Sequence, residues 1–314
     1  PPAIISVFLG DQLEDVINQL CDTGEATHSK QGGTLKTGVA MLPDLDQDVT
    51  DRNRTSPFAF TNNKFEFRMV GSSASVAPSN VVLNTIVAEA FKEAADELEK
   101  ADDFQMAVHD LIKKLFSEHR RIIFNGNGYS SAWVKEAEKR GLPNISCMVE
   151  AIPALTTEKA VKLFETFHVY TRAELESRAE VEYDSYSKII HIEALTMTNI
   201  AGKQIIPAII RYTARLADSM AKVQSVCPEA DTSVQRDLLI EASARLGEIK
   251  AAHKKLVELQ EECRSIRSAK ERAHACRERL VPAMEELRRP VDLLERIVDK
   301  DLWPMPSYGD LLFE

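Results

Sequence analysis

Cysteine is scarce in this sequence and its few copies are far apart. The 314 residues include five cysteines, an odd number, at positions 21, 147, 227, 263 and 276. This scatter predicts reduced thiols rather than a disulfide framework or a zinc site. His274 and Cys276 form a poor ligand pair, because side chains two residues apart on a helix point to different faces. We therefore expect a cytoplasmic protein, or a plastid one if the source is eukaryotic.

The sequence also lacks a basic excess and a long apolar run. Its formal net charge is −10, whereas a nucleic-acid surface requires clustered positive charge. No apolar stretch approaches the roughly 20 residues that a membrane-spanning helix needs. We therefore expect neither nucleic acid nor a membrane among the partners.

Aromatic residues make up only 6% of the chain, yet four of them alternate within one short segment. Phe58 and Phe60 follow Pro57, and Phe65 and Phe67 follow a polar turn. This period of two predicts two strands joined as a hairpin through residues 61–63. On the second strand, one face would bury both aromatic rings and the other would carry charged groups.

The charged groups of the second strand are Glu66 and Arg68. A glutamate can hold a hard divalent cation, and the planar fork of an arginine binds a carboxylate or phosphate with two parallel hydrogen bonds. The pattern therefore suits a metal and oxyanion site. An exposed ion pair on a solvated strand face would give the same pattern.

The segment containing this strand resembles the late catalytic segment of glutamine synthetase, in particular its large type III form. Several further motifs follow in the same order along most of the chain. The stretches that carry the resemblance are residues 53–77, 80–90, 122–130, 141–143, 151–155 and 192–197.

The resemblance implies an ATP-dependent ligase that joins ammonia to glutamate through γ-glutamyl phosphate, with Mg²⁺ or Mn²⁺ as cofactor. Arg54 matches the arginine that contacts the transferring phosphate and nucleotide. Glu66 matches a metal-binding glutamate, and Arg68 matches the arginine that binds glutamate and the developing phosphoryl charge. The partners implied are glutamate, ammonia, ATP and further copies of the same chain in a ring assembly, a dodecamer.

Two positions depart from the family pattern. Ala59 stands near the place of a second arginine. A lysine several residues upstream of the metal-binding glutamate is not cleanly matched, and Lys64 is the candidate substitute. The chain also opens at Pro1 without a methionine, so we expect a piece of a longer polypeptide. Most metal ligands of the family lie upstream, and the 314 residues alone should therefore be inactive.

The expected fold class is α+β and mostly α. Residues 1–187 would form the C-terminal part of a catalytic domain, with few antiparallel strands plus helices, and residues 188–314 a long-helix antiparallel bundle. Apolar three–four spacing from Leu239 to Leu280 predicts one long helix. His253 lies in its apolar stripe and is interpreted as a packing residue. A non-catalytic helical scaffold or oligomerisation protein is the alternative function.

Three further segments leave alternatives open. Residues 125–128 (Asn-Gly-Asn-Gly) suit a phosphate-binding loop, or more readily a turn that leads into a helix capped by Ser130 or Ser131. Four aspartates between residues 44 and 51 form an ion cluster or a solvated loop. Residues 302–308 either pack back on the bundle or dock on a neighbouring subunit.

Overall fold

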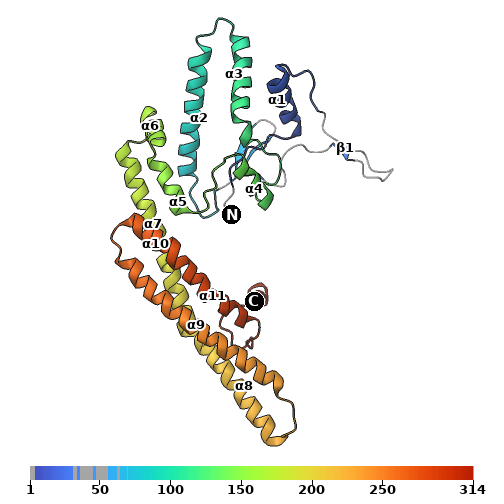
Figure 1. Cartoon of the computed structure of the whole chain (residues 1–314), viewed down its shortest axis with the longest axis vertical. Coiled ribbons are helices and arrows are strands. Elements are labelled where there is room, and N and C mark those ends of the chain that lie inside the picture. The colour runs from blue at the N-terminus through green and yellow to red at the C-terminus, as the bar shows by residue number, and fades with distance from the viewer. Residues whose placement is uncertain are drawn as a thin grey trace. The chain divides into compact units, whose positions relative to one another are not determined.

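A computed structural model describes residues 4–30, 34–35, 45–46, 56–61, 64–68 and 70–313. The chain divides into two compact units, Pro1–Arg172 and Ala173–Glu314. Both are built mainly of helices (Figure 1), which confirms the mostly α class. The division falls ahead of residue 187, which lies inside helix α7 (Arg172–Ile200). The assignment of residues 1–187 to a catalytic domain remains a prediction.

Short antiparallel strand pairs supply the β structure of the first unit. Strand β1 (Thr34–Leu35) pairs with β2 (Leu45–Asp46), and β3 (Phe58–Phe60) pairs with β4 (Phe65–Phe67). The second pair is the predicted hairpin. Single parallel bridges join Val7 to Ile123 and Phe8 to Ala59, so the segment before α1 lies alongside both the hairpin and the chain after α3.

Polar caps begin several helices of the first unit. Their bounds are α1 (Asp11–Thr23), α2 (Ala77–Leu98), α3 (Phe104–His119), α4 (Ser131–Lys139), α5 (Met148–Ala151) and α6 (Glu158–Thr166), with 3₁₀ turns η1 (Arg120–Ile122) and η2 (Ile152–Thr156). The side chains of Asp103, Ser130 and Thr157 each accept a hydrogen bond from a backbone N–H in the first turn of α3, α4 and α6. These bonds satisfy donors that a helix start leaves unpaired. Of the two capping residues predicted for α4, Ser130 and Ser131, the structure has Ser130 as the cap.

The Asn-Gly-Asn-Gly segment forms a structural turn. The Oδ1 atom of Asn125 accepts hydrogen bonds from the backbone N–H groups of Leu9 and Gly10 at 3.0 and 3.1 Å. Its Nδ2 atom donates to Glu14 at 2.6 Å. A Cβ atom at Gly126 would lie 2.5 Å from the ring of Phe124. The side chain of Asn125 thus fastens this turn to the start of α1, and the structural interpretation accounts for the motif.

Trp133 on α4 is the centre of a small core. It is fully buried, and its Nε1 atom donates to the carbonyl oxygen of Ile4 at 3.1 Å. Its ring stacks on Phe124 with 4.1 Å between centroids, and the guanidinium of Arg140 lies 5.5 Å from its centroid. This packing fixes the segment before α1 against α4.

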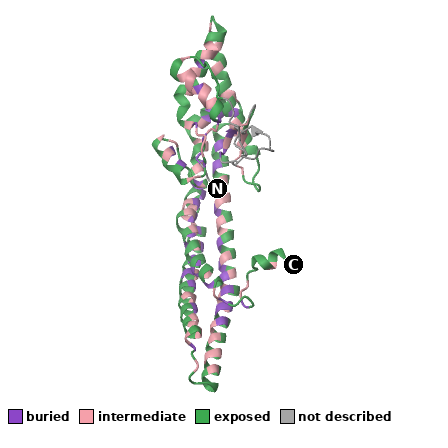
Figure 2. Cartoon of the chain, turned by 90° about the vertical axis from the view of Figure 1, so that its right-hand side faces the viewer, coloured by how far each residue is buried: buried purple, intermediate pink, exposed green. Residues whose placement is uncertain are grey.

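The second unit is a bundle of long helices. Its elements are α7, the π-helical segment η3 (Ala201–Ile205), α8 (Ile206–Val226), α9 (Ser233–Ser265), α10 (Ala269–Ala275), the π-helical segment η4 (Cys276–Leu280), α11 (Val281–Glu295) and α12 (Tyr308–Leu312). One apolar core joins side chains from α7, α8, α9 and α11. Figure 2 shows buried residues distributed along these helices. The predicted bundle is confirmed.

Both π-helical segments precede a proline near the start of the next helix, Pro207 in α8 and Pro282 in α11. Proline lacks a backbone N–H and cannot sustain the regular α-helical bonding pattern, and a π turn accommodates the interruption.

At the first π-helical segment, His253 approaches the helix backbone, with Nε2 3.1 Å from the carbonyl oxygen of Thr198. A Cβ atom at Gly202 would lie 3.2 Å from this nitrogen. His253 is therefore a packing residue, as predicted.

The prediction of one helix from Leu239 to Leu280 is wrong. Helix α9 ends at Ser265, and the chain reverses before Ser268 caps α10 by accepting from the N–H of Glu271. Arg272 stabilises the reversal, since it donates to the carbonyl oxygen of Ile266 at 2.9 Å. The apolar spacing continued across the turn because α9 and the helices after it bury faces in the same core.

Candidate functional site

The β3–β4 hairpin positions the two charged residues predicted for the site. Ala59 and Glu66 are directly paired across the strands, and the N–H of Thr61 donates to the carbonyl oxygen of Lys64 at 2.7 Å. The N–H of Arg68 donates to the carbonyl oxygen of Pro57 at 2.8 Å. These backbone bonds fix the places from which Glu66 and Arg68 extend.

Glu66 and Arg68 form a close ion pair. The Oε2 atom of Glu66 accepts from Nε and Nη2 of Arg68 at 3.1 and 2.9 Å. Lys64 places its Nζ atom 3.3 Å from Oε1. The Arg68 side chain is 15% exposed and that of Glu66 is 38% exposed. Lys64 thus lies beside the glutamate.

These contacts change the pKa of Glu66. The hydrogen bond from Arg68 is the main cause that lowers the pKa below 4.5, and the contact with Lys64 lowers it further. Hydrogen bonding to the charged form of a carboxyl favours that form. Glu66 is therefore a carboxylate at neutral pH, which is the form that ligates a divalent cation.

The pH dependence of the pair follows from this shift. Because the folded pKa is lowered, the stabilisation from the pair is present above the unfolded pKa and is lost as the pH falls through the folded value. We expect the carboxyl ¹³C signal of Glu66 to titrate with a midpoint below 4.5. Arg68→Ala should raise this midpoint more than Lys64→Ala does. An equal midpoint in wild type and Arg68→Ala would contradict the assignment.

The aromatic face of the hairpin differs from the prediction. Phe65 is 50% exposed, so the expectation that β4 buries both of its rings is wrong. The rings instead contact one another, with centroid separations of 5.4 Å between Phe58 and Phe65 and 6.1 Å between Phe58 and Phe67. Pairing of two strands brings their alternate side chains, here the phenylalanines, to one face of the hairpin. Burial of that face also requires another part of the protein to pack over it, and the alternating sequence does not predict such a layer.

Arg54 and three of the four aspartates lie outside the described residues, and only the backbone of Asp46, in β2, is described. The phosphate-contact role of Arg54 and the ion-cluster alternative stay predictions. Among the described residues, no group of three or more histidine, cysteine, aspartate or glutamate side chains could hold a metal ion. Glu66 is the residue in this part of the chain for which a metal-ligand role is predicted, and carboxylate oxygens suit a hard divalent cation.

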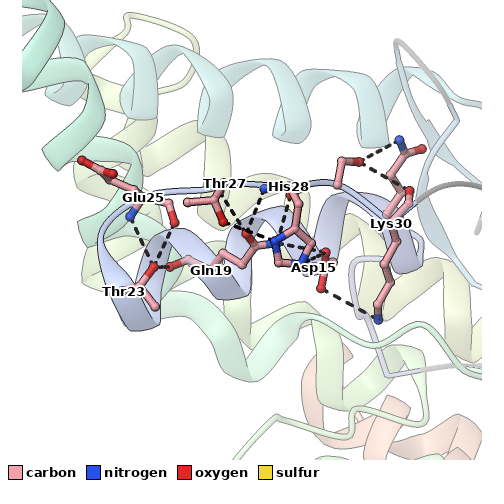
Figure 3. Close-up of polar contacts among 9 residues, drawn as sticks. Asp15, Gln19, Thr23, Glu25, Thr27, His28 and Lys30 are labelled. Carbon is pink, nitrogen blue, oxygen red and sulfur yellow. Dashed lines mark hydrogen bonds and ion pairs between the residues drawn. The ribbon is translucent and has the colours of Figure 1, made fainter.

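A polar network on α1 was not anticipated from the sequence (Figure 3). Gln19 accepts from the N–H of Thr27 at 3.1 Å and donates to the carbonyl oxygen of His28 at 3.0 Å. Asp15 lies 3.9 Å from charged or titratable nitrogens of both His28 and Lys30. The network fastens residues 24–30 along α1. Its members are mostly exposed, and its physical role is to order a loop.

No helix in the described ranges combines the length and the apolar character needed to cross a bilayer.

Comparison with known proteins relates this chain to a family. Residues 107–224 match the glutamine synthetase C-terminal domain. The whole chain aligns with a type-3 glutamine synthetase of Dictyostelium discoideum at 37% identity, covering 43% of that protein. The chain resembles the C-terminal portion of type-3 glutamine synthetase. The resemblance read from the sequence motifs is thereby confirmed.

Two bacterial glutamine synthetases also align with the complete chain. The protein from Bacteroides fragilis is 34% identical, with 44% of its length covered, and that from Butyrivibrio fibrisolvens is 33% identical, with 45% covered. The chain thus spans less than half the length of these relatives. The glutamine synthetase C-terminal domain match begins after Glu66 and Arg68. The hairpin lies within the alignments with the three relatives, which span all 314 residues of this chain.

Proposed function

We propose that this chain is part of a type III glutamine synthetase that forms glutamine from glutamate, ammonia and ATP through γ-glutamyl phosphate. The observation that carries the proposal is the alignment of all its residues with three glutamine synthetases at 33–37% identity. The Glu66–Arg68 pair supports it, because the hairpin holds an anion and a guanidinium side by side.

Arg68 would bind the substrate carboxylate and offset negative charge as the phosphoryl group transfers. Its guanidinium is oriented by two hydrogen bonds to one oxygen of Glu66 and is largely buried. Orientation before the reaction is what makes such a group effective, since phosphoryl transfer depends on positioning and charge neutralisation. Arg54 would contact the phosphate and nucleotide.

Glu66 would supply one oxygen ligand to Mg²⁺ or Mn²⁺. When bound, the divalent cation neutralises phosphate charge during transfer. Lys64 and Arg68 keep the carboxyl ionised, so it needs no deprotonation before it binds the cation. Further ligands would come from outside the described residues, and the proposed enzyme would assemble from several copies of the chain in a ring.

The proposal predicts that catalysis requires a longer polypeptide than these 314 residues. The chain alone should form no glutamine from glutamate, ammonia and ATP, because it supplies only part of the ligand set. The longer polypeptide that contains it should form glutamine in the same assay. Glutamine formation by the 314-residue chain at enzyme-like rates, or none by the longer polypeptide, would overturn the proposal.

Glu66→Gln tests the metal role in the longer polypeptide. The amide removes the negative charge and is a weaker ligand for a hard cation, so we expect half-maximal activity to need at least about tenfold more Mg²⁺. Glu158→Gln is the matched control, because Glu158 also pairs with an arginine, Arg172, at 2.8 Å but lies on an exposed helix start. An unchanged Mg²⁺ requirement in Glu66→Gln would remove Glu66 from the metal site.

A further inference from the structure

Two free cysteines lie together in the core of the bundle. Cys263 is in the last turn of α9, Cys276 begins η4, and they are 1 and 2% exposed. A hydrogen bond joins their thiols. The reversal of the chain between α9 and α10, seen in Figure 1, brings the two residues together. The pair has no part in the glutamine-forming reaction proposed above.

A cleft of about 470 Å³ gives access to this pair. Both cysteines line it, together with His191 and Lys188 of α7. The cleft is open to solvent, since the side chain of Lys188 is 70% exposed. Although His191 could ligate a metal ion, the described residues contain no group of three or more histidine, cysteine, aspartate or glutamate side chains suited to one. Two neighbouring thiols instead suit the formation of a disulfide.

Polar contacts hold the walls of the cleft around the thiols. Arg272 donates to Asp184 of α7 at 2.8 Å and to the carbonyl oxygen of Ile266 at 2.9 Å. One side chain therefore joins α7, α10 and the reversal. Ser187, also on α7, hydrogen bonds to the thiol of Cys276. The two sulfur atoms are thus held together before any reaction, which makes a bond between them an intramolecular step.

The two thiols differ in how readily they ionise. Burial raises the pKa of both, and it raises the pKa of Cys276 to about 11. At Cys263 the positive charge of Arg279 and the hydrogen bond from Cys276 lower the pKa and offset part of the effect of burial. The thiolate is the reactive form of a cysteine. Cys263 is therefore the sulfur suited to attack, and its small thiolate fraction at neutral pH makes the reaction slow.

We propose that Cys263 and Cys276 are a redox-active dithiol, which a hydroperoxide that enters through the cleft converts to a disulfide within the chain. The thiolate of Cys263 attacks one oxygen of the hydroperoxide, the O–O bond breaks, and the other oxygen leaves as an alkoxide or hydroxide that takes up the thiol proton. The sulfur of Cys276 then attacks the sulfenic acid formed on Cys263. The S–O bond breaks, and hydroxide leaves with the proton of Cys276 as water. The dithiol loses two electrons, and the peroxide gains them.

The disulfide would join the end of α9 to η4 across the reversal. A covalent link of this kind limits the open conformations of the loop that it closes. Residues 266–275 lie in that loop and would open less often in the oxidised chain. A thiol reductant would restore the free cysteines, so the link is reversible.

Peptide mass spectrometry of the oxidised 314-residue chain tests the site. The reduced chain is treated with hydrogen peroxide, the remaining thiols are alkylated, and the peptides are analysed without reduction. We expect a peptide pair linked through Cys263 and Cys276, which dithiothreitol separates. Cys21, Cys147 and Cys227 do not line the cleft and serve as internal controls that should stay outside disulfides. A main product that links other cysteines or two chains, or no disulfide at all, would overturn the proposal.

Two single substitutions test which sulfur attacks. In Cys276→Ala the sulfenic acid on Cys263 should persist, and dimedone should label it. In Cys263→Ala the labelling of Cys276 should be at least about threefold lower, because its thiol ionises less readily. Circular dichroism checks that both variants are folded. Equal labelling, or more labelling in Cys263→Ala, would refute the assignment of Cys263 as the attacking sulfur.

Phenylarsine oxide supplies a measurement that needs no substitution, because trivalent arsenic bridges two neighbouring thiols. Pretreatment of the wild-type chain should block the Cys263–Cys276 disulfide, and unchanged disulfide formation would count against a close dithiol.

Hydrogen exchange measures the effect of the link on the reversal. Amides of residues 266–275 should exchange at least about threefold more slowly after oxidation and recover with dithiothreitol. Residues 227–232, which connect α8 to α9, are the matched control and should not change. Equal exchange of residues 266–275 in the oxidised and reduced chains would show that the disulfide does not restrain the reversal.

Discussion

Arg68→Ala in the longer polypeptide is expected to reduce kcat/KM for glutamine formation about 10²–10³-fold, on the scale of losing one oriented charge-stabilising donor. The substitution removes the guanidinium that Glu66 orients through Oε2. We expect the concentration of glutamate needed for half-maximal rate to rise as well, because the same group would bind the substrate carboxylate. Steady-state assays with varied glutamate measure both effects.

Arg172→Ala is the control for this experiment. Arg172 at the start of α7 pairs through Nη2 with Glu158 at the start of α6 at 2.8 Å, and both side chains are exposed. Its loss should change activity little, since exposed ion pairs contribute little to stability. Arg68→Lys adds a further test, because lysine keeps the charge but loses the planar fork, and should remain well below wild type. Kinetics like wild type in Arg68→Ala would remove Arg68 from the active site.

Leu256→Ala is expected to lower the free energy of unfolding of the bundle by about 2–5 kcal/mol. Leu256 is fully buried in the core that joins α7, α8, α9 and α11. The substitution removes apolar surface from the core and leaves a cavity that these helices fill only partly. Urea unfolding followed by far-ultraviolet circular dichroism measures the change, and the bundle transition should move to lower urea.

Val257→Ala is the matched control, because it truncates the adjacent residue of the same helix. Val257 is 39% exposed, so we expect a change of less than about 1 kcal/mol. Leu256→Ile, which keeps the volume, should fall between Val257→Ala and Leu256→Ala. If Leu256→Ala and Val257→Ala shifted the transition equally, the placement of Leu256 in the core would be wrong.

Local patterns in the sequence were sufficient to predict several elements. Alternating phenylalanines predicted the hairpin that carries Glu66 and Arg68, and Ser130 predicted the start of α4. These features depend on interactions between residues close in sequence, such as strand alternation and side-chain caps. The resemblance to glutamine synthetase was also identifiable from the sequence, because several motifs occur in the same order along the chain, and the comparisons confirm it.

Long-range contacts determined the features that the sequence left open. The Asn-Gly-Asn-Gly segment is compatible in sequence with a phosphate-binding loop and with a structural turn. The side chain of Asn125 binds residues more than 100 positions away, and this contact favours the turn. The proximity of Lys64 to Glu66 depends on the side-chain conformations within the hairpin. The structure therefore shows that Arg68 and Lys64 are the cationic neighbours of Glu66. The role of Arg54 remains a prediction from the resemblance to glutamine synthetase.

The sequence by itself determined the helical class, the hairpin and the resemblance to glutamine synthetase, since periodicity, caps and motifs are properties of neighbouring residues. Only the tertiary structure decided that the chain reverses after Ser265, that Phe65 is half exposed, and that the α12 side chains are uncovered. The physical reason is that burial depends on which distant segments pack together. Apolar spacing predicts which face of a helix or strand can be buried. Whether that face is buried depends on the segment that packs against it.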